Sequence, residues 1–345
     1  MVESHPLLPQ LDCLPRFPLL DGLTPIQRLL RLERALGGAE CPQIYVKRDD
    51  LMGVGGGGNK LRKLELLLGE AIADGCDTFV TTGGRQSNHA RLSAAAAARA
   101  GLACELVLTD VVPRDDDTYR HNGNVLLDGI FGATIHHRHG QVDALAVARE
   151  RAASLAAAGR KAYVVGAGGS SPRGCLGYAA CAAEVVAQEQ ELGFRFHRII
   201  VPNGSSGTHA GLLAGMAAIG DEPARLQSFT VLASIAEAEE KTRVLARETL
   251  TLLGSHKAIA DNAVAVAGDQ LGEGYGIPTS AMLRAVRLLA RTEGLLLDPV
   301  YGGKAFAGLL AAIHAGRFRR VDAVLFVMTG GTPGLFAYAS AFQAE

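Results

Sequence analysis

Residues 55–65 of this chain read Gly55-Gly56-Gly57-Gly58-Asn59-Lys60-Leu61-Arg62-Lys63-Leu64-Glu65, so four glycines and an asparagine precede a lysine. Glycine adopts positive φ angles freely and lets a ligand approach the backbone closely. From Leu61 onward the apolar residues recur at helical spacing, at Leu61, Leu64, Leu68, Ala71 and Ile72. The pattern therefore predicts a glycine-rich loop and a helix that begins at Lys60.

A lysine in the first helical turn lies at the positive end of the helix dipole, which disfavours an ammonium group. Arg62 and Lys63 add like charge beside Lys60, and both effects lower the pKa of its amine. A lysine that is neutral at pH 7 is a nucleophile suited to Schiff-base chemistry. Taken alone, the motif fits equally well a loop followed by a solvated lysine.

Composition sets the broad class of the protein. A chain of 345 residues is long enough for two domains or one large α/β unit, and its 48% hydrophobic and 20% charged residues are typical of a globular protein. The formal net charge of −1 gives no reason to expect nucleic acid or an anionic membrane as partner. No apolar run reaches the length of a membrane span.

Two further features bear on the compartment. The start of the chain, Met1–Pro6, has neither a basic stretch nor an apolar core, so we do not expect a signal peptide. Six cysteines are scattered without CxxC pairs, which favours reduced thiols in a cytoplasm and argues against a zinc site.

Strands and helices are predicted to alternate along the chain. Short apolar runs predict strands at 44–47, 78–81, 104–108, 162–165, 198–201, 226–232 and 323–328. Helices are predicted at 25–36, from 60, at 88–100, 118–131, 144–158 and 177–190, from 209, and at 236–252, 279–293 and 304–314. This alternation indicates an α/β fold of parallel sheets with helices on both faces. Gly, Ser and Pro crowd near 166–173, which suggests a domain boundary there. A second boundary near the glycine run at 55–58 would make the smaller domain an insertion in the larger one.

Three loops follow predicted strands, where open α/β sheets bind ligands. Residues 203–208 (Asn-Gly-Ser-Ser-Gly-Thr) precede a helix and could bind phosphate, although an ordinary turn is the alternative. In residues 83–89, Ser87 and Asn88 could hold a carboxylate, but alone Ser87 is better explained as a helix cap. Thr329 follows the last strand and is well placed to meet a ligand.

Two tyrosines, Tyr275 and Tyr301, each lie in a turn rich in glycine or proline. Tyrosines in loops are usually packing or surface residues, so neither position alone indicates a function.

Together these segments resemble the fold-type-II pyridoxal phosphate enzymes, which are tryptophan synthase β-like. More narrowly they resemble the group that contains 1-aminocyclopropane-1-carboxylate (ACC) deaminase and D-cysteine desulfhydrase. The matching motifs run in the family's order between about Thr24 and Tyr338 and comprise 57–60 with 62–65, 86–89, 204–211, 275–276, 298–301 and 329–331. The resemblance implies pyridoxal 5'-phosphate as cofactor, a large cofactor-binding domain of residues 1–56 and 170–345, and a small inserted domain of residues 57–169.

The resemblance also implies a role for each matching residue. Lys60 would carry the cofactor covalently and later move the α-proton. Ser87 would bind the substrate carboxylate, Asn88 the cofactor's phenolic oxygen and the substrate, and His89 the substrate. Tyr275 and Tyr301 would frame the reacting carbon. The remaining cofactor contacts would come from Lys63, Gly204, Ser205, Ser206, Gly207, Thr208 and Thr329.

The implied activity is β-elimination from a small amino acid by a cytoplasmic homodimer, in the first place conversion of D-cysteine to pyruvate, sulfide and ammonia. L-Cysteate sulfo-lyase and ACC deaminase are alternatives on the same scaffold. Rivals from other classes are a pyridoxal phosphate-binding protein without turnover and a nicotinamide oxidoreductase, for which residues 166–171 lack the third fingerprint glycine.

Two residues depart from the group's pattern. Arg85 stands where the family more usually has an aliphatic residue. It could pair with an anionic substrate such as cysteate if it turned into the pocket, but it is better explained as a surface arginine that points away from the cleft. Gly302 follows Tyr301 where the deaminase branch has a glutamate. Without that carboxylate, we expect Thr329 to face the pyridine nitrogen of the cofactor.

Overall fold

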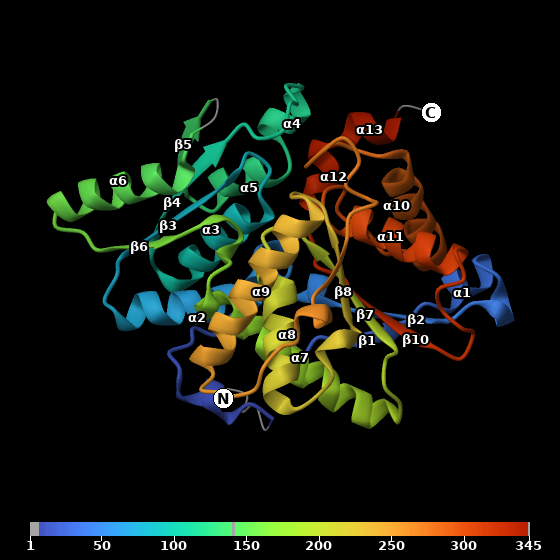
Figure 1. Ribbon diagram of the computed structural model, residues 1–345. Helices are drawn as coiled ribbons and strands as arrows, with labels where there is room; N and C mark the ends of the chain where they lie inside the picture. The colour runs from blue at the N-terminus through green and yellow to red at the C-terminus, as the bar shows by residue number, and fades with distance from the viewer. Residues whose placement is uncertain (1–6, 140–141, 344–345) are drawn as a thin grey trace.

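The computed structural model describes residues 7–139 and 142–343, and the predicted absence of a signal peptide at Met1–Pro6 lies outside these ranges. Two separate sheets with helices packed around them form the molecule (Figure 1). In the described ranges, no helix is long and apolar enough to cross a membrane.

The strands and helices have the following bounds. The strands are β1 (Ile26–Arg28), β2 (Gln43–Lys47), β3 (Thr78–Gly84), β4 (Ala103–Thr109), β5 (Thr134–Arg138), β6 (Ala162–Val165), β7 (Arg198–Asn203), β8 (Leu226–Thr230), β9 (Ala265–Ala267) and β10 (Ala323–Val327). The α-helices are α1 (Leu30–Ala35), α2 (Lys60–Ala73), α3 (Asn88–Ala100), α4 (Asp117–His121), α5 (Asn124–Ile130), α6 (Ala144–Ala157), α7 (Pro172–Leu192), α8 (Gly207–Ile219), α9 (Ile235–Leu252), α10 (Ser280–Glu293), α11 (Gly302–His314), α12 (Pro333–Ala337) and α13 (Ala339–Gln343).

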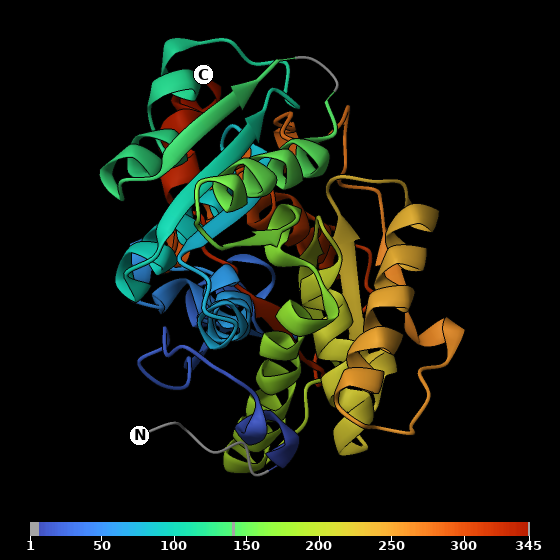
Figure 2. The same cartoon turned by 90° about the vertical axis from the view of Figure 1, so that its left-hand side faces the viewer.

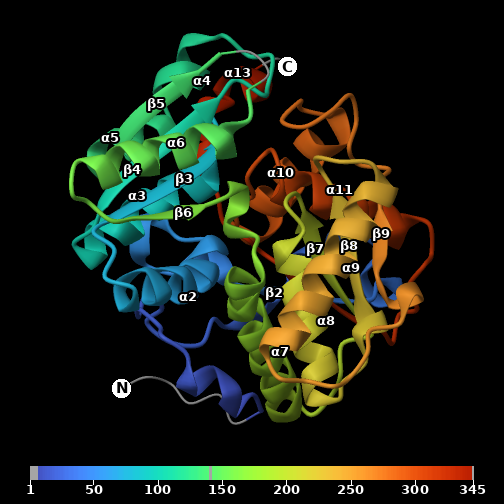
Figure 3. The same cartoon turned by 60° about the vertical axis from the view of Figure 1, so that its left-hand side comes forward.

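The smaller sheet has the strand order β5-β4-β3-β6, with every pair parallel. Successive side chains of a strand point to opposite faces, and both faces are covered here. Phe79 packs into the core formed with α2 and α3, whereas Val80 packs toward Ala148 and Leu155 of α6. Figure 3 shows α6 and α3 on the two sides of this sheet.

The larger sheet has the strand order β1-β2-β10-β7-β8-β9. Its pairs are parallel except β1 with β2. Leu325 points into a core with α7, α8 and α9, and Phe326 points into a core with α10 and α11. Continuous apolar strands buried on both faces are typical of such sheets. The predicted α/β architecture is therefore confirmed.

Some predicted elements were wrong. The helix predicted at 25–36 is instead strand β1 followed by α1, because Ile26 pairs with Lys47 of β2. The helix predicted at 118–131 is broken between α4 and α5 at Gly123, whose φ is +64° and where a Cβ would lie 2.8 Å from the Pro333 carbonyl oxygen. Strands β5 and β9 and helices α12 and α13 were not predicted. Strand β5 is polar in sequence, so it lacks the apolar run that marks a buried strand. Strand β9 and helices α12 and α13 are only three to five residues long, too short to show a periodic pattern.

The two sheets are joined through α2, which packs on α3 of the smaller unit and on α7 beside the larger one. The end of the chain returns to the smaller unit, as Figures 1 and 2 show for α13 near α4. There the rings of Tyr119 and Tyr338 meet edge to face with centroids 5.5 Å apart. The strands of the smaller sheet all fall within 78–165; the division into domains at 57 and 169 stays a prediction.

Candidate active site

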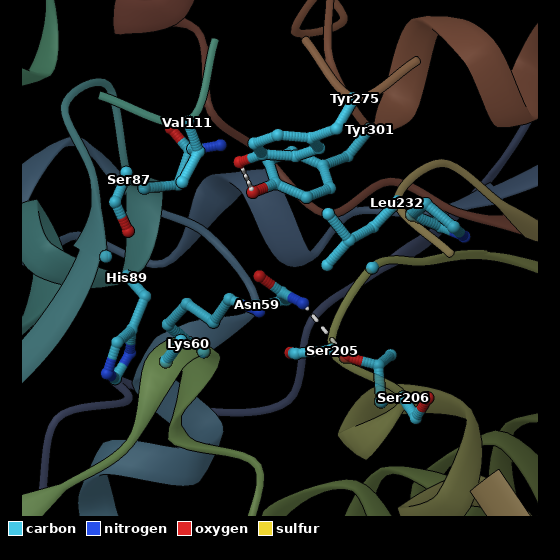
Figure 4. A pocket seen from close by; sticks show the side chains of 18 of the residues that line it. Asn59, Lys60, Ser87, His89, Val111, Ser205, Ser206, Leu232, Tyr275 and Tyr301 are labelled. Carbon is cyan, nitrogen blue, oxygen red and sulfur yellow. Dashed lines mark hydrogen bonds between the residues drawn. The ribbon is translucent and has the colours of Figure 1, made fainter. Parts of the chain in front are cut away.

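A cavity lies where the carboxyl ends of strands from both sheets meet, the usual place for a ligand in open α/β folds (Figure 4). Strands β3 and β4 of the smaller sheet contribute to it, and so do the ends of β7 and β10 of the larger sheet. It is lined by Asn59, Lys60, Gly83, Gly84, Ser87, Asn88, His89, Thr109, Val111, Ala144, Ala167, Gly168, Pro202, Gly204, Ser205, Ser206, Thr208, Leu232, Tyr275, Tyr301 and Thr329.

The glycine run places Lys60 at this cavity. Gly57 has φ +74°, and a Cβ there would lie 2.1 Å from the Asp50 carbonyl oxygen, so only glycine fits. Gly58 forms an isolated bridge with Gly330. The N–H of Asn59 donates to the carbonyl of Thr329 at 3.1 Å. Helix α2 then begins at Lys60, as predicted.

The pKa of the Lys60 amine is held well below its ordinary value, first by burial and next by the charge of Lys63. Arg62, the other charge that the sequence suggested, does not contribute in this way. Its guanidinium is buried and pairs with Asp49 at 2.8 Å and Glu184 at 2.7 Å. The pKa shift of Lys60 thus has the direction that the sequence predicts, and desolvation is its main cause.

The loop 203–208 has the features expected of an anion cradle. Helix α8 begins at Gly207, two residues before the predicted start, so its free N–H groups point toward the loop. Ser206 has φ +68° and a buried hydroxyl without a hydrogen-bond partner among the described residues. Asn59 Nδ2 donates to Thr208 Oγ1 at 3.0 Å and so ties the glycine run to this loop.

Lys63 lies behind the cradle and not among the described lining residues. Its Nζ donates to the Gly168 carbonyl at 3.1 Å and to Ser170 Oγ at 3.0 Å, and Ser170 Oγ lies 2.7 Å from Ser205 Oγ. A Cβ on Gly207 would lie 2.7 Å from Lys63 Nζ. Burial lowers the pKa of Lys63 to about 8. Ser170 belongs to this group although the sequence did not single it out, since it lay only in a loop rich in Gly and Ser.

Ser87 is both a helix cap and a lining residue. Its Oγ accepts a hydrogen bond from the N–H of Ala90 at 3.1 Å, as in an ordinary N-cap. The same hydroxyl borders the cavity beside the start of α3 (Figure 4). The helix cap is therefore confirmed, and binding of a carboxylate by Ser87 stays a prediction. Asn88 follows at the first position of α3 and also lines the cavity.

His89 presents a fixed tautomer to the same wall. The Thr81 hydroxyl donates to the Val165 carbonyl at 2.9 Å, so it can only accept from His89 Nε2, which lies 2.9 Å away. His89 Nδ1 is therefore an acceptor, and it has no partner within the described ranges. Burial lowers the pKa of this ring well below its usual value, and Lys60 lowers it further. His89 is neutral at physiological pH.

Tyr275 and Tyr301 meet over the cavity with their hydroxyl oxygens 2.5 Å apart (Figure 4). Burial raises the pKa of both phenols, so both are protonated at neutral pH. The carboxylate of Asp298 fixes Tyr301, because Oδ1 accepts its backbone N–H at 2.7 Å. Oδ2 of the same carboxylate accepts from the N–H of Gly302 at 2.8 Å. Asp298 is therefore a positioning group that the sequence motif contained but did not explain.

Arg85 does not turn into the cavity. Its guanidinium pairs with Asp110 through Nη2 at 2.7 Å and Nε at 2.9 Å. It is not one of the described residues that line the cavity. Arg85 therefore points away from the cleft, the arrangement that the sequence favoured over a contact with an anionic substrate.

The profile of the family described as "Pyridoxal-phosphate dependent enzyme" matches residues 18–330. This chain belongs to that family. D-cysteine desulfhydrase of Serratia proteamaculans (strain 568) is 40% identical over 94% of this chain and 96% of its own length. The D-cysteine desulfhydrase of Yersinia enterocolitica is 41% identical with the same coverage of both chains.

Solved structures agree with this assignment. An ACC deaminase homologue superposes with a TM-score of 0.87 and is 34% identical, over 100% of this chain and 99% of its own. A fungal L-serine ammonia-lyase from Rhizomucor miehei shares the fold, with a TM-score of 0.64 and 16% identity over 94% of this chain and 98% of its own. The predicted fold type and cofactor class are confirmed.

Proposed function

We propose that this protein is a pyridoxal phosphate-dependent lyase that removes a β-substituent from a small amino acid, with D-cysteine as the first candidate substrate. The observation that carries the proposal is the grouping of a desolvated Lys60 amine, the Ser87 hydroxyl and the paired phenols of Tyr275 and Tyr301 around one cavity. The names of the relatives that are about 40% identical support the choice of substrate.

The residues of the cavity fit the cofactor. The unpartnered Ser206 hydroxyl and the start of α8 suit a phosphate, with Ser205 and Thr208 beside them. Lys60 would form the covalent bond, and Thr329 would lie at the ring nitrogen. When bound, pyridoxal phosphate supplies an electron sink for the carbanion formed at the substrate's α-carbon.

Each side chain then has a defined task. Ser87 and the free N–H groups at the start of α3 would hold the substrate carboxylate. Lys60 would hold the cofactor and, as a free amine, would take the α-proton at Nζ. One phenol of the Tyr275–Tyr301 pair would donate its O–H to the other, which leaves the O–H of the accepting phenol free to donate to a departing thiolate.

The charge of the lining favours a substrate with a neutral side chain. The described lining residues include two basic side chains, Lys60 and His89, and no acidic one. The ring of His89 is neutral because its pKa is lowered. A sulfonate would find no arginine here, because Arg85 is paired with Asp110. Cysteate is therefore the weaker alternative. ACC deamination stays a second candidate because the ACC deaminase homologue covers the whole chain.

A cytoplasmic homodimer is part of this proposal. It rests on the scattered unpaired cysteines, which suit a reducing compartment, and on the resemblance to the group.

A product-release assay with five compounds tests the proposal. Pyruvate is measured with D-cysteine, L-cysteine, L-cysteate and β-chloroalanine, and 2-oxobutanoate is measured with ACC. We expect fastest release from D-cysteine or β-chloroalanine, and borohydride reduction should fix the cofactor on the Lys60 peptide. Labelling at Lys63 or Lys304 would contradict the assignment of Lys60. Cofactor binding without turnover of any of the five compounds would favour a binding protein, and fastest turnover of cysteate would overturn the choice of substrate.

A further inference from the structure

Asn124, the first residue of α5, lies beside Asn88 although 36 residues separate them in sequence. Its side chain is fully buried at 0% exposure. Asn124 Nδ2 donates to the backbone carbonyl of Gln86 at 3.0 Å and to Asn88 Oδ1 at 2.9 Å. Asn124 is not one of the described lining residues of the cavity, so it can act on a ligand only through Asn88.

This pair of contacts fixes which way both amides face. A backbone carbonyl can only accept, so the atom of Asn124 that lies 3.0 Å from the Gln86 oxygen must be its NH₂ group. That same NH₂ group then requires an acceptor at 2.9 Å, which must be the oxygen of Asn88. The NH₂ group of Asn88 therefore points the other way.

Asn88 belongs to the wall of the cavity, and its NH₂ group lies beside Gly331. Asn88 lines the cavity, and a Cβ on Gly331 would lie 2.4 Å from Asn88 Nδ2, so glycine leaves the space that this group fills. Among the described residues, the side-chain hydrogen bond of Asn88 is made by Oδ1, which accepts from Asn124, and none is made by Nδ2. It is a donor available to a ligand.

We propose that Asn124 is a positioning residue that holds Asn88 as a hydrogen-bond donor toward an anionic oxygen of the ligand. The inference rests on the proposed function, under which that oxygen is the phenolic oxygen of pyridoxal phosphate. A flipped Asn88 would present its carbonyl oxygen to the same atom, and two acceptors facing one another repel.

Gln86 keeps Asn124 in place. Its Oε1 accepts the backbone N–H of Asn124 at 2.9 Å. Its Nε2 donates to the carbonyls of Tyr119 at 2.6 Å and Asn122 at 2.8 Å. The start of α5 is thereby tied to the start of α3, so the donor of Asn124 has little freedom to turn away from Asn88.

Asn124→Asp tests the inference, since it keeps the shape and removes the NH₂ donor. Asn122→Asp is the matched control, because the Asn122 side chain accepts the Gly123 N–H at 2.7 Å and a carboxylate still can. Both variants add one negative charge at the junction between α4 and α5. Each apoprotein is titrated with pyridoxal 5'-phosphate, and the pH dependence of the visible band of each holoprotein is recorded.

We expect Asn124→Asp to weaken cofactor binding by about tenfold or more, the usual worth of a hydrogen bond to a charged group. The pH at which its visible band changes should rise, because the phenolic oxygen loses a donor. Asn122→Asp should bind the cofactor like the unaltered protein. Equal affinity and an unshifted band in a normally folded Asn124→Asp would overturn the inference.

A double-mutant comparison keeps the inference testable if Asn124→Asp fails to fold. Asn124→Ala should weaken cofactor binding in the unaltered protein and have almost no further effect once Asn88 is alanine. Equal effects in both backgrounds would show a merely structural role and overturn the inference. If the unaltered apoprotein itself does not bind pyridoxal phosphate, the proposed function fails and not the arrangement of the two amides.

Discussion

The hydroxyl oxygens of Tyr275 and Tyr301 lie 2.5 Å apart although the two residues come from different loops. The loop of Tyr275 is held from two sides. Lys304 Nζ donates to the Gly274 carbonyl at 2.8 Å, and the Tyr338 hydroxyl donates to the Gly276 carbonyl at 2.8 Å. The surrounding structure thus positions the loop that carries Tyr275 for its contact with Tyr301.

The two phenols should act as one unit. Tyr275→Phe and Tyr301→Phe are each expected to slow pyruvate release by roughly 100-fold or more, the range of a lost acid–base group. The double variant should be little worse than either single one, because each phenol needs the other. Visible absorption should show the cofactor still bound in all three. Multiplying effects in the double variant would show that the phenols act separately.

Lys304 should be required for activity although it does not line the cavity. It is fully buried and donates to the carbonyls of Leu271 at 2.7 Å and Gly274 at 2.8 Å. Lys304→Met leaves both carbonyls without this donor, at a cost of about 1–3 kcal/mol for each one that stays unsatisfied. We expect a lower free energy of unfolding in urea and a kcat reduced at least tenfold. Tyr338→Phe, which frees the other side of the loop, should change kcat in the same direction. Full kcat in Lys304→Met would contradict the positioning role.

Ser87→Ala should impair turnover far more than cofactor binding. The lost cap to Ala90 costs about 1 kcal/mol of stability, and the lost contact to substrate costs roughly 2–4 kcal/mol in the barrier. Ser234→Ala is a control, because Ser234 caps α9 in the same way and does not line the cavity. The control should lower the melting temperature and leave kcat/KM unchanged. Near-normal activity in Ser87→Ala would reduce Ser87 to a helix cap.

Asp128 should make the protein less stable as pH rises. Burial raises the pKa of its carboxyl to about 8, although the charge of Arg91 opposes this, and neither oxygen has a hydrogen-bond partner among the described residues. From about pH 4 to 8 the unfolded chain carries Asp128 ionised while the folded protein keeps it protonated, so unfolding is increasingly favoured. Each pKa unit corresponds to roughly 1.4 kcal/mol.

Asp128→Asn removes this titration without changing the shape of the side chain. Melting curves between pH 5 and 8 should show the variant gaining stability relative to the unaltered protein as pH rises. Parallel stability profiles for the two proteins would contradict the raised pKa.

The spacing of apolar residues predicted those helices and strands whose conformation agrees with their own sequence pattern. Helix α3 has the predicted bounds, and α6 and β10 differ by one residue from theirs, because their apolar spacing and flanking residues agree with the final packing. Ile26 to Arg28 fit a helical pattern, but pairing with β2 decides their conformation. Such pairing between distant segments leaves no signal in a short window.

The site shows the same limit. Lys60 and Ser87 are recognisable because a glycine run and a strand-to-helix turn mark them. Ser170, Asn124 and Lys304 are not, because each acts through a contact with a residue far along the chain. Their side chains satisfy backbone and amide groups that only the assembled fold brings within reach.

Thr329 should set which substrates react. It lies at the end of β10, its carbonyl accepts from Asn59, and its side chain borders the cavity. The carboxylate nearest to Gly302 is Asp298, whose Oδ2 would lie 3.1 Å from a Cβ built there, but it accepts three backbone N–H groups. We therefore expect an uncharged hydroxyl and not a carboxylate at the pyridine nitrogen, which leaves the ring largely unprotonated and the electron sink weaker.

A weaker sink suits substrates whose β-group leaves readily and handicaps the opening of a cyclopropane ring. The unaltered protein should release ammonia from D-cysteine and β-chloroalanine far faster than from ACC. Thr329→Val should slow these reactions only about three- to tenfold, since a neutral hydrogen bond is worth about 0.5–1.5 kcal/mol, and should keep their order. Thr329→Asp places a negative charge at the ring nitrogen and should raise the rate with ACC relative to D-cysteine. Efficient ring opening by the unaltered protein would mean that a neutral hydroxyl suffices, and the argument from charge would then fail.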